Sequence, residues 1–138
     1  MHNPTRQAGH TLLELTAVIT IVGTLSAIAL PRYADTMRSA RVAKMEVARH
    51  AVNESARMYH MKWMLAGSPA AAVLDKVQMN EAGYPTSAGI VVAAGLADDY
   101  DTRVAGVIAV DAAHPGCSLV YAPETGTSVA GYADGAGC

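Results

Sequence analysis

The chain has 138 residues, of which 51% are hydrophobic and 16% charged, and this composition fits one folded domain with one appendage. The formal net charge is −2, so composition gives no support for nucleic-acid binding, which needs a concentrated basic surface. We therefore expect no nucleic-acid partner.

The first predicted element in chain order is a long apolar helix. Between Arg6 and Arg32 the only charged residue is Glu14, and residues 12–30 are mostly Leu, Ile, Val and Ala. At about 1.5 Å per residue this helix would be roughly 28 Å long, close to the thickness of the hydrocarbon core of a bilayer. The segment is therefore a candidate for membrane insertion.

Three interpretations of this segment compete. A secretory signal peptide with a small-residue cleavage site at 27–29, or a plain membrane anchor, would explain its apolar character but not Glu14, because a carboxylate in an apolar region needs a partner. Cleavage after Gly9 would explain both features. The new α-amino group on His10, in the same chain or in a neighbouring subunit, would then pair with the carboxylate and set the stagger between subunits.

Residues 8–33, AGHTLLELTAVITIVGTLSAIALPRY, resemble the class III signal and N-terminal helix of type IV prepilins and pseudopilins. That family has a short polar leader ending in Gly, a Thr-Leu-hydrophobic-Glu-Leu run, and a Pro that closes the apolar stretch. The resemblance implies a leader peptide at 1–9, cut after Gly9 by a prepilin peptidase that also methylates the new N-terminus. That N-terminus is His10, where the family usually has Phe.

The same resemblance implies assembly roles for Glu14, Gly23 and Pro31. Glu14 matches the carboxylate that is paired across subunits, and the other two match positions that weaken the helix. Gly costs about 1 kcal/mol in a helix interior, and Pro removes a backbone donor and clashes with the preceding turn. The implied organisation is a leader at 1–9, an apolar transmembrane and assembly half-helix at 10–31, and a globular head at 32–138.

After Pro31 the helical pattern continues to about Leu65, and Gly67, Ser68 and Pro69 end it. The joined helix would be roughly 80 Å long, so its first half must find apolar partners that this chain cannot supply. An apolar stripe at three- to five-residue intervals predicts the face that the rest of the head covers. The stripe comprises Tyr33, Met37, Ala40, Met45, Ala48, Val52, Ala56, Tyr59 and Trp63.

The rest of the chain predicts a small antiparallel sheet packed on that stripe. Residues 73–79 indicate a strand or hairpin arm, 83–85 a turn, and Ser87 the cap of a short helix over 88–96. Three apolar, β-branched runs predict strands at 104–110, 117–121 and 128–132, with a hairpin turn at 123–126. The expected fold is α+β, the type IV pilin fold, with one long helix, one small sheet and a C-terminal disulfide-closed loop.

The two cysteines, Cys117 and Cys138, have no zinc or c-type haem spacing. They predict one disulfide formed outside the cytoplasm, and two free thiols are the alternative. Closing this loop would stabilise the fold by about 3 kcal/mol on the chain-entropy model.

Other chemistry has weaker support. An acidic cluster offers oxygen ligands to Ca²⁺, although a solvated loop is favoured: Asp98, Asp99 and Asp101. Hydrolase residue types occur without a nucleophile-elbow motif: Asp111, His114 and Ser118. The histidines are scattered and lack a metal-binding spacing. We expect no enzyme activity, no cofactor and no metal.

Charge is distributed unevenly along the chain. Residues 32–63 hold seven basic side chains against three acidic ones, whereas 64–138 hold two against eight. One interpretation is two solvated faces, and the other is complementary surfaces that meet in an assembly.

Short motifs in the head resemble pilins of the mannose-sensitive haemagglutinin (MSHA) pili. They are the GYPTSAGI segment at 83–90, the region of Trp63, and the Cys-x-x-x-Tyr start of the closing loop at 117–121. This resemblance implies a homo-oligomeric surface filament for attachment or motility. Its partners would be the prepilin peptidase, the pilus assembly machinery and, before assembly, the inner membrane. The alternatives are a pseudopilin of a type II secretion system and a membrane-anchored small hydrolase.

Overall fold

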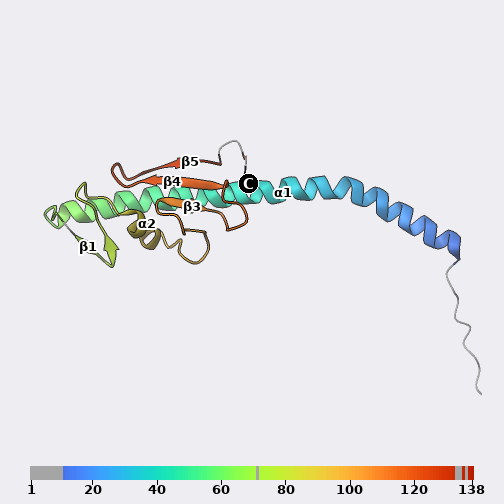
Figure 1. Ribbon diagram of the computed structural model, residues 1–138, viewed down its shortest axis with the longest axis horizontal. Coiled ribbons are helices and arrows are strands. Elements are labelled where there is room, and N and C mark those ends of the chain that lie inside the picture. Colours follow the sequence, from blue (N-terminus) through green and yellow to red (C-terminus); the bar gives the residue numbers. More distant parts are fainter. Residues whose placement is uncertain (1–10, 71, 133–134, 136) are drawn as a thin grey trace, which may run out of the picture. The chain divides into compact units, whose positions relative to one another are not determined.

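The computed structural model describes residues 11–70, 72–132, 135 and 137–138 (Figure 1). The chain divides into two compact units, Met1–Thr36 and Met37–Cys138. Helix α1, Leu12–Leu65, contributes to both units. Its bounds confirm the predicted helix to within one residue, and Gly67 and Ser68, both with positive φ, follow its end.

In the second unit α1 buries one face. The buried residues recur every three or four positions, as expected for one side of a helix. They are Met45, Ala48, Val52, Ala56 and Tyr59. The prediction was wrong for Tyr33, Met37 and Ala40, which are exposed. The buried face begins only at Val42 and Met45.

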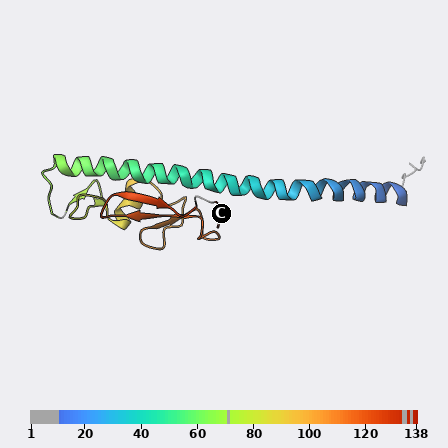
Figure 2. The ribbon, with the colours of Figure 1, turned by 90° about the horizontal axis from the view of Figure 1, so that it is seen from above.

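The main sheet has three antiparallel strands in the order β3–β4–β5. They are β3, Val107–Ala109; β4, Ser118–Ala122; and β5, Thr127–Ala130. The sheet lies along one side of α1 in this unit (Figure 2). Leu119 of β4 is opposite Ile108 of β3 and Ala130 of β5, which places all three on the side that packs on α1. The predicted strands are confirmed, but β3 is shorter than expected.

The segment before this sheet forms a small hairpin and a short helix. Strands β1, Val73–Leu74, and β2, Val77–Gln78, are joined by Asp75 and Lys76, both with positive φ as a tight two-residue turn requires. Helix α2 is Ser87–Ala93, and its N-cap is Thr86, whose hydroxyl accepts a hydrogen bond from the Gly89 amide. The prediction of Ser87 as the cap was therefore wrong by one residue, because the extended backbone of Thr86 aims its own hydroxyl at that amide.

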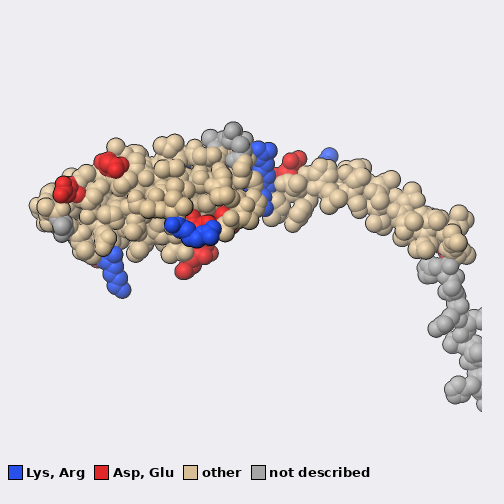
Figure 3. All heavy atoms as spheres, in the orientation of Figure 1, with Lys and Arg blue, Asp and Glu red and all other residues tan. Residues whose placement is uncertain are grey.

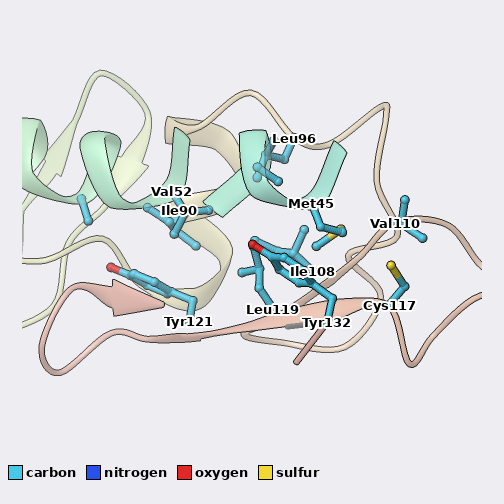
Figure 4. Packing of buried hydrophobic residues seen from close by; sticks show 12 residues of the cluster. Met45, Val52, Ile90, Leu96, Ile108, Val110, Cys117, Leu119, Tyr121 and Tyr132 are labelled. Carbon is cyan, nitrogen blue, oxygen red and sulfur yellow. The ribbon is translucent and has the colours of Figure 1, made fainter. Parts of the chain in front are cut away.

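The hydrophobic core lies between α1, α2 and the main sheet (Figure 4). Side chains from all three elements point into it, among them Met45, Val52, Ile90, Ile108 and Leu119. A second cluster under the β1–β2 hairpin contains Tyr59, Ala72, Val77 and Met79.

A disulfide closes the end of the chain. It joins Cys117 to Cys138 with a Cα–Cα distance of 4.6 Å, so the predicted pairing is confirmed and neither cysteine is free. Cys117 is fully buried in the main core, and Cys138 packs against the same cluster. The fold is thus α+β, with one long N-terminal helix, small antiparallel sheets and a disulfide-closed C-terminal loop.

Candidate assembly surface

The first unit exposes a large apolar surface on α1. The large apolar side chains between residues 12 and 30 are each between 54% and 80% exposed: Leu12, Leu13, Leu15, Val18, Ile19, Ile21, Val22, Leu25, Ile28 and Leu30. Figure 3 shows the long uncharged surface along this part of the helix. Helix α1 is long and apolar enough to cross a membrane, but a secretory signal sequence meets the same criteria of length and composition. Such a surface needs apolar surroundings that the described part of the chain does not provide.

The threonines in this apolar stretch do not interrupt its apolar character. Three hydroxyls donate hydrogen bonds of 2.7–2.9 Å to carbonyl oxygens three or four residues earlier in the same helix. The donor and acceptor pairs are Thr16 with Leu13, Thr20 with Thr16, and Thr24 with Ile21. Because these polar hydrogens are satisfied within the helix, the side chains enter an apolar environment at low cost.

Glu14 forms a capping box with Thr11 at the start of α1. The Glu14 Oε2 atom accepts hydrogen bonds from the Thr11 backbone N at 2.9 Å and from the Thr11 Oγ1 at 3.1 Å. In return the Thr11 Oγ1 accepts from the Glu14 backbone N at 3.2 Å. The sequence prediction assigned Glu14 only to an amine and missed Thr11, although the Thr-x-x-Glu spacing before an apolar run is the signature of this cap. Gly9 and His10, the predicted cleavage site and methylated N-terminus, lie outside the described residues.

Gly23 and Pro31 lie within α1, and the helix continues through both. A Cβ atom placed on Gly23 would have no heavy atom within 4 Å, so nothing in the described chain requires glycine there. Pro31 has no backbone N–H to donate to the preceding turn. The predicted weakening of the helix at these two positions stays a prediction about the assembled state.

Three basic side chains of α1 bind backbone oxygens of the second unit. Arg38 Nε donates to the Gly135 oxygen at 2.9 Å, and an Arg41 guanidinium N donates to the Cys138 oxygen at 2.8 Å. Lys44 Nζ donates to the Asp99 and Val110 carbonyl oxygens at 2.7 and 3.2 Å. Part of the basic charge predicted for an assembly contact therefore positions the closing loop of the same chain.

A carboxylate on α1 links the helix to the end of the chain. Glu46 accepts hydrogen bonds from Arg49, at 2.5 Å, and from the Tyr132 hydroxyl. These bonds, above all the one from Arg49, lower the pKa of Glu46 to about 2. Burial, together with the nearby Glu46 carboxylate, raises the pKa of Tyr132 to about 12. The cluster thus stays as a carboxylate and a neutral phenol near neutral pH.

The acidic segment proposed as a weak Ca²⁺ candidate is not gathered into a ligand set. Asp101 accepts hydrogen bonds of 2.8 and 2.6 Å from the Arg103 guanidinium, which lowers the pKa of the Asp101 carboxyl to about 2. Within residues 11–70, 72–132, 135 and 137–138, no group of three or more His, Cys, Asp or Glu side chains is placed to hold a metal ion. Asp98 and Asp99 therefore remain surface acids with no described metal partner.

The hydrolase-type residues form a pair and not a triad. His114 Nδ1 lies 2.8 Å from Asp111 Oδ1, and this contact lowers the pKa of the Asp111 carboxyl. In the described part of the chain no hydrogen bond joins the His114 ring to the Ser118 hydroxyl. The Asp111 oxygen also accepts from the amides of Ala113 and His114, so the pair closes a turn.

Sequence reasoning missed an aromatic stack at the end of α1. The His60 ring stacks on the Tyr84 ring with centroids 4.3 Å apart and on the Trp63 ring at 5.7 Å. His60 Nδ1 also lies 2.9 Å from the Gly83 oxygen. Residues 60 and 84 are far apart in sequence, and only the Gly-Tyr-Pro turn signal marked the second of them. The stack ties that turn to the helix.

A shallow cleft of about 710 Å³ opens beside α2, near the turn between β4 and β5. Its lining includes the carboxylates of Glu81 and Glu124 and the hydroxyls of Thr86 and Ser87. Neither of the predicted assembly residues Glu14 and Gly23 lines this cleft. The exposed apolar half of α1 therefore remains the strongest candidate for a functional surface.

In comparisons with known proteins, no family model, no curated protein and no solved structure matches the chain.

Proposed function

We propose that the chain is a structural subunit of a type IV pilus of the MSHA type, which polymerises through the apolar half of α1 into a surface filament for attachment. It would be made as an inner-membrane precursor, cut after Gly9 and methylated on His10. The Cys117–Cys138 bond supports passage through an oxidising compartment. No enzyme activity forms part of this proposal.

The observation that carries the proposal is the all-round exposure of an apolar helix attached to a separate, well-packed head. Burying each of the ten large apolar side chains is worth roughly 1 kcal/mol at their observed exposure, so the helix gains on the order of 10 kcal/mol from apolar surroundings. A bilayer provides such surroundings before assembly, and copies of the same helix provide them afterwards. The helix can therefore leave the bilayer for a filament core without losing this stabilisation.

Glu14 is the group whose environment would change most in that transfer. In the single chain its carboxylate accepts two hydrogen bonds from Thr11 and has no cationic partner among the described residues. In a helix bundle the same carboxylate would be desolvated, and a positive amine from a neighbouring subunit would offset that cost. Only subunits at one stagger would bring the two charges together, which makes Glu14 a register residue.

Two variants separate the capping role of Glu14 from its charge. Glu14→Gln keeps the capping box, because Gln serves at this position, but removes the charge. Thr11→Val removes the cap and keeps the charge, at a cost of about 1 kcal/mol in helix stability. We expect Glu14→Gln to be cleaved normally but to reduce the yield of sheared surface filaments at least about tenfold. Thr11→Val should stay near the wild-type yield.

Filament yield is measured on sheared surface fractions, and mass spectrometry of the same material reports cleavage after Gly9 and any N-methyl group. A normal yield from Glu14→Gln would refute the charge-pairing role. A stable uncut monomer, with no filament wherever the export apparatus works, would refute the proposed function. Short filaments confined to the periplasm would identify the chain as a secretion pseudopilin.

A further inference from the structure

The last turns of α1 carry a row of exposed methionines. Met58, Met61 and Met64 recur every three residues and are 42%, 55% and 50% exposed, although methionine is ordinarily among the most buried side chains. Tyr59 is buried, and it lies two residues before Met61 and so on the opposite side of the helix. Figure 2 shows the head on one side of α1 only. This methionine row belongs to neither core cluster, so core packing does not account for it.

The spacing of the methionine row brings neighbouring thioethers within reach of each other. Residues three apart on a helix have Cβ atoms about 5–6 Å apart. The methionine side chain adds three rotatable bonds, so two adjacent sulfur atoms can approach one ligand. Met58 and Met64 are six residues apart, about 9 Å along the helix axis, which is too far for a shared ligand. Met61 is therefore the common member of two pairs, one with Met58 and one with Met64.

The charged side chains around the methionine row are already paired. Arg57 lies 3.2 Å from the Glu54 carboxylate, and the Lys62 ammonium lies 2.7 Å from the Asp75 carboxylate. Residues 54–65 contain no other lysine, arginine, aspartate or glutamate. A cation bound at the row would therefore meet no unpaired ammonium or guanidinium group from this segment.

The imidazole next to the row is held by the head. His60 Nδ1 lies 2.9 Å from the Gly83 oxygen, and the ring stacks on Tyr84 and Trp63. Because a carbonyl oxygen only accepts hydrogen bonds, Nδ1 carries the proton of this contact. The ligand atoms that the row itself offers are thioether sulfurs. The expectation that the chain binds no metal came from histidine, cysteine and carboxylate patterns, and thioether sulfur is a different type of ligand.

We propose that the methionine row binds a soft monovalent metal ion, Cu(I), between Met61 and one of its two neighbours in the row. Soft thioether ligands favour Cu(I), whereas oxygen ligands suit harder ions. A thioether has no proton to lose, so this binding does not compete with protonation as binding to a thiolate or an imidazole does. Both cysteines are joined in the disulfide, so no thiolate of this chain competes for the ion. The site goes beyond the proposed filament function and does not depend on it.

Methionine-to-leucine variants test the site, because leucine keeps an apolar side chain of similar volume and removes the sulfur. The probe is Ag(I), the redox-inert heavier analogue of Cu(I), titrated into the full chain in mild detergent. Met61→Leu leaves only isolated thioethers and should weaken binding at least about tenfold. Met58→Leu and Met64→Leu each keep one pair and should weaken it only about twofold. Met37→Leu is the matched control, because Met37 is 38% exposed on the same helix with no other methionine within four residues, and it should bind like wild type.

Methyl NMR of the methionines locates the bound ion. The chain has seven methionines, and Ag(I) should first shift the methyl resonances of the three in the row. The resonances of the buried Met45 and Met79, and of the exposed Met37, should stay in place at the same Ag(I) concentration. Shifts of Met37 in parallel with the row would show unspecific binding to any exposed thioether and would overturn the proposal.

Two further outcomes would also overturn the site. Unchanged affinity in Met61→Leu would contradict the shared-pair geometry, and a site made of His60 and Met64 would give that result. Zn²⁺ that displaces Ag(I) from the row at equal concentration would contradict a soft-metal site. Under anaerobic, reducing conditions Cu(I) should rank the variants in the same order as Ag(I). Filaments whose subunits do not bind Ag(I) would refute the metal site alone, whereas a chain that binds Ag(I) but never assembles would refute the filament function alone.

Discussion

Removing the Cys117–Cys138 bond should lower the free energy of unfolding of the second unit by about 3 kcal/mol. The bond spans a sequence separation of 21 residues, and a loop of this length restricts the unfolded chain by about that amount. For a unit of roughly 100 residues this corresponds to a fall in melting temperature of roughly 10–20 °C. The variant of choice is Cys138→Ser, because Cys117 is fully buried in the core and Cys138 is only partly buried.

The assay is denaturant unfolding of the full chain in mild detergent, followed by the fluorescence of Trp63, the only tryptophan in the chain. Trp63 stacks on His60 and donates its indole N–H to the Pro69 oxygen at 2.9 Å, so its emission reports loss of the head structure at the end remote in sequence from the bond. Reduced wild-type protein should match Cys138→Ser, and reductant should not change the variant further. A loss below about 1 kcal/mol, or a wild type insensitive to reduction, would refute the loop-closure reasoning.

Two other predictions concern the second unit. The hydrogen bond from Arg49 lowers the pKa of Glu46 from 4.5 to about 2 in the folded chain, so the unfolded chain binds this proton more readily. The resulting stabilisation of the fold is complete above about pH 4.5 and is lost as the pH falls towards 2. Glu46→Gln should flatten the pH dependence of the unfolding midpoint in this window, and an unchanged slope would contradict it. Gly126 and Gly95 have nearly the same positive φ, +65° and +66°, but only at Gly126 would an added Cβ lie 2.2 Å from the Tyr84 ring. Gly126→Ala should therefore lower the free energy of unfolding by about 2–4 kcal/mol, and Gly95→Ala by about 1 kcal/mol. Equal falls in melting temperature would argue against the clash.

The predictions that the structure confirms rest on signals local to the sequence. The first half of α1 follows from a continuous apolar run, and its second half from a 3.6-residue apolar periodicity that ends before Gly67 and Ser68. The β4–β5 hairpin follows from two β-branched runs separated by turn residues. With only two cysteines in the chain, one pairing was possible for an intramolecular bond. The helix and the hairpin are predicted from residues that are close together in the sequence, and the disulfide pairing is predicted because only one intramolecular pair is possible.

One of the predictions that failed depends on packing between distant segments, and two depend on local capping geometry. The apolar stripe on α1 does not reveal where its cover begins, so the prediction of a buried face is wrong for Tyr33, Met37 and Ala40. The N-cap of α2 is Thr86 and not the predicted Ser87. Adjacent hydroxyl residues have similar capping propensity, so the backbone conformation decides between them. Thr11 was not predicted as the partner of Glu14, although the Thr-x-x-Glu spacing is the signature of a capping box.

By itself, the sequence predicted an apolar helix without a cover of its own, a head that packs on the second half of that helix, and a disulfide as the favoured state of its two cysteines. These properties follow from periodicity, hydrophobicity and count. Only the tertiary structure decided that Ile108, Leu119 and Ala130 lie side by side across three strands, and that Arg38 and Arg41 bind the closing loop. The reason is physical: strand register and long-range hydrogen bonds join residues whose separation along the chain carries no signal of their contact in space.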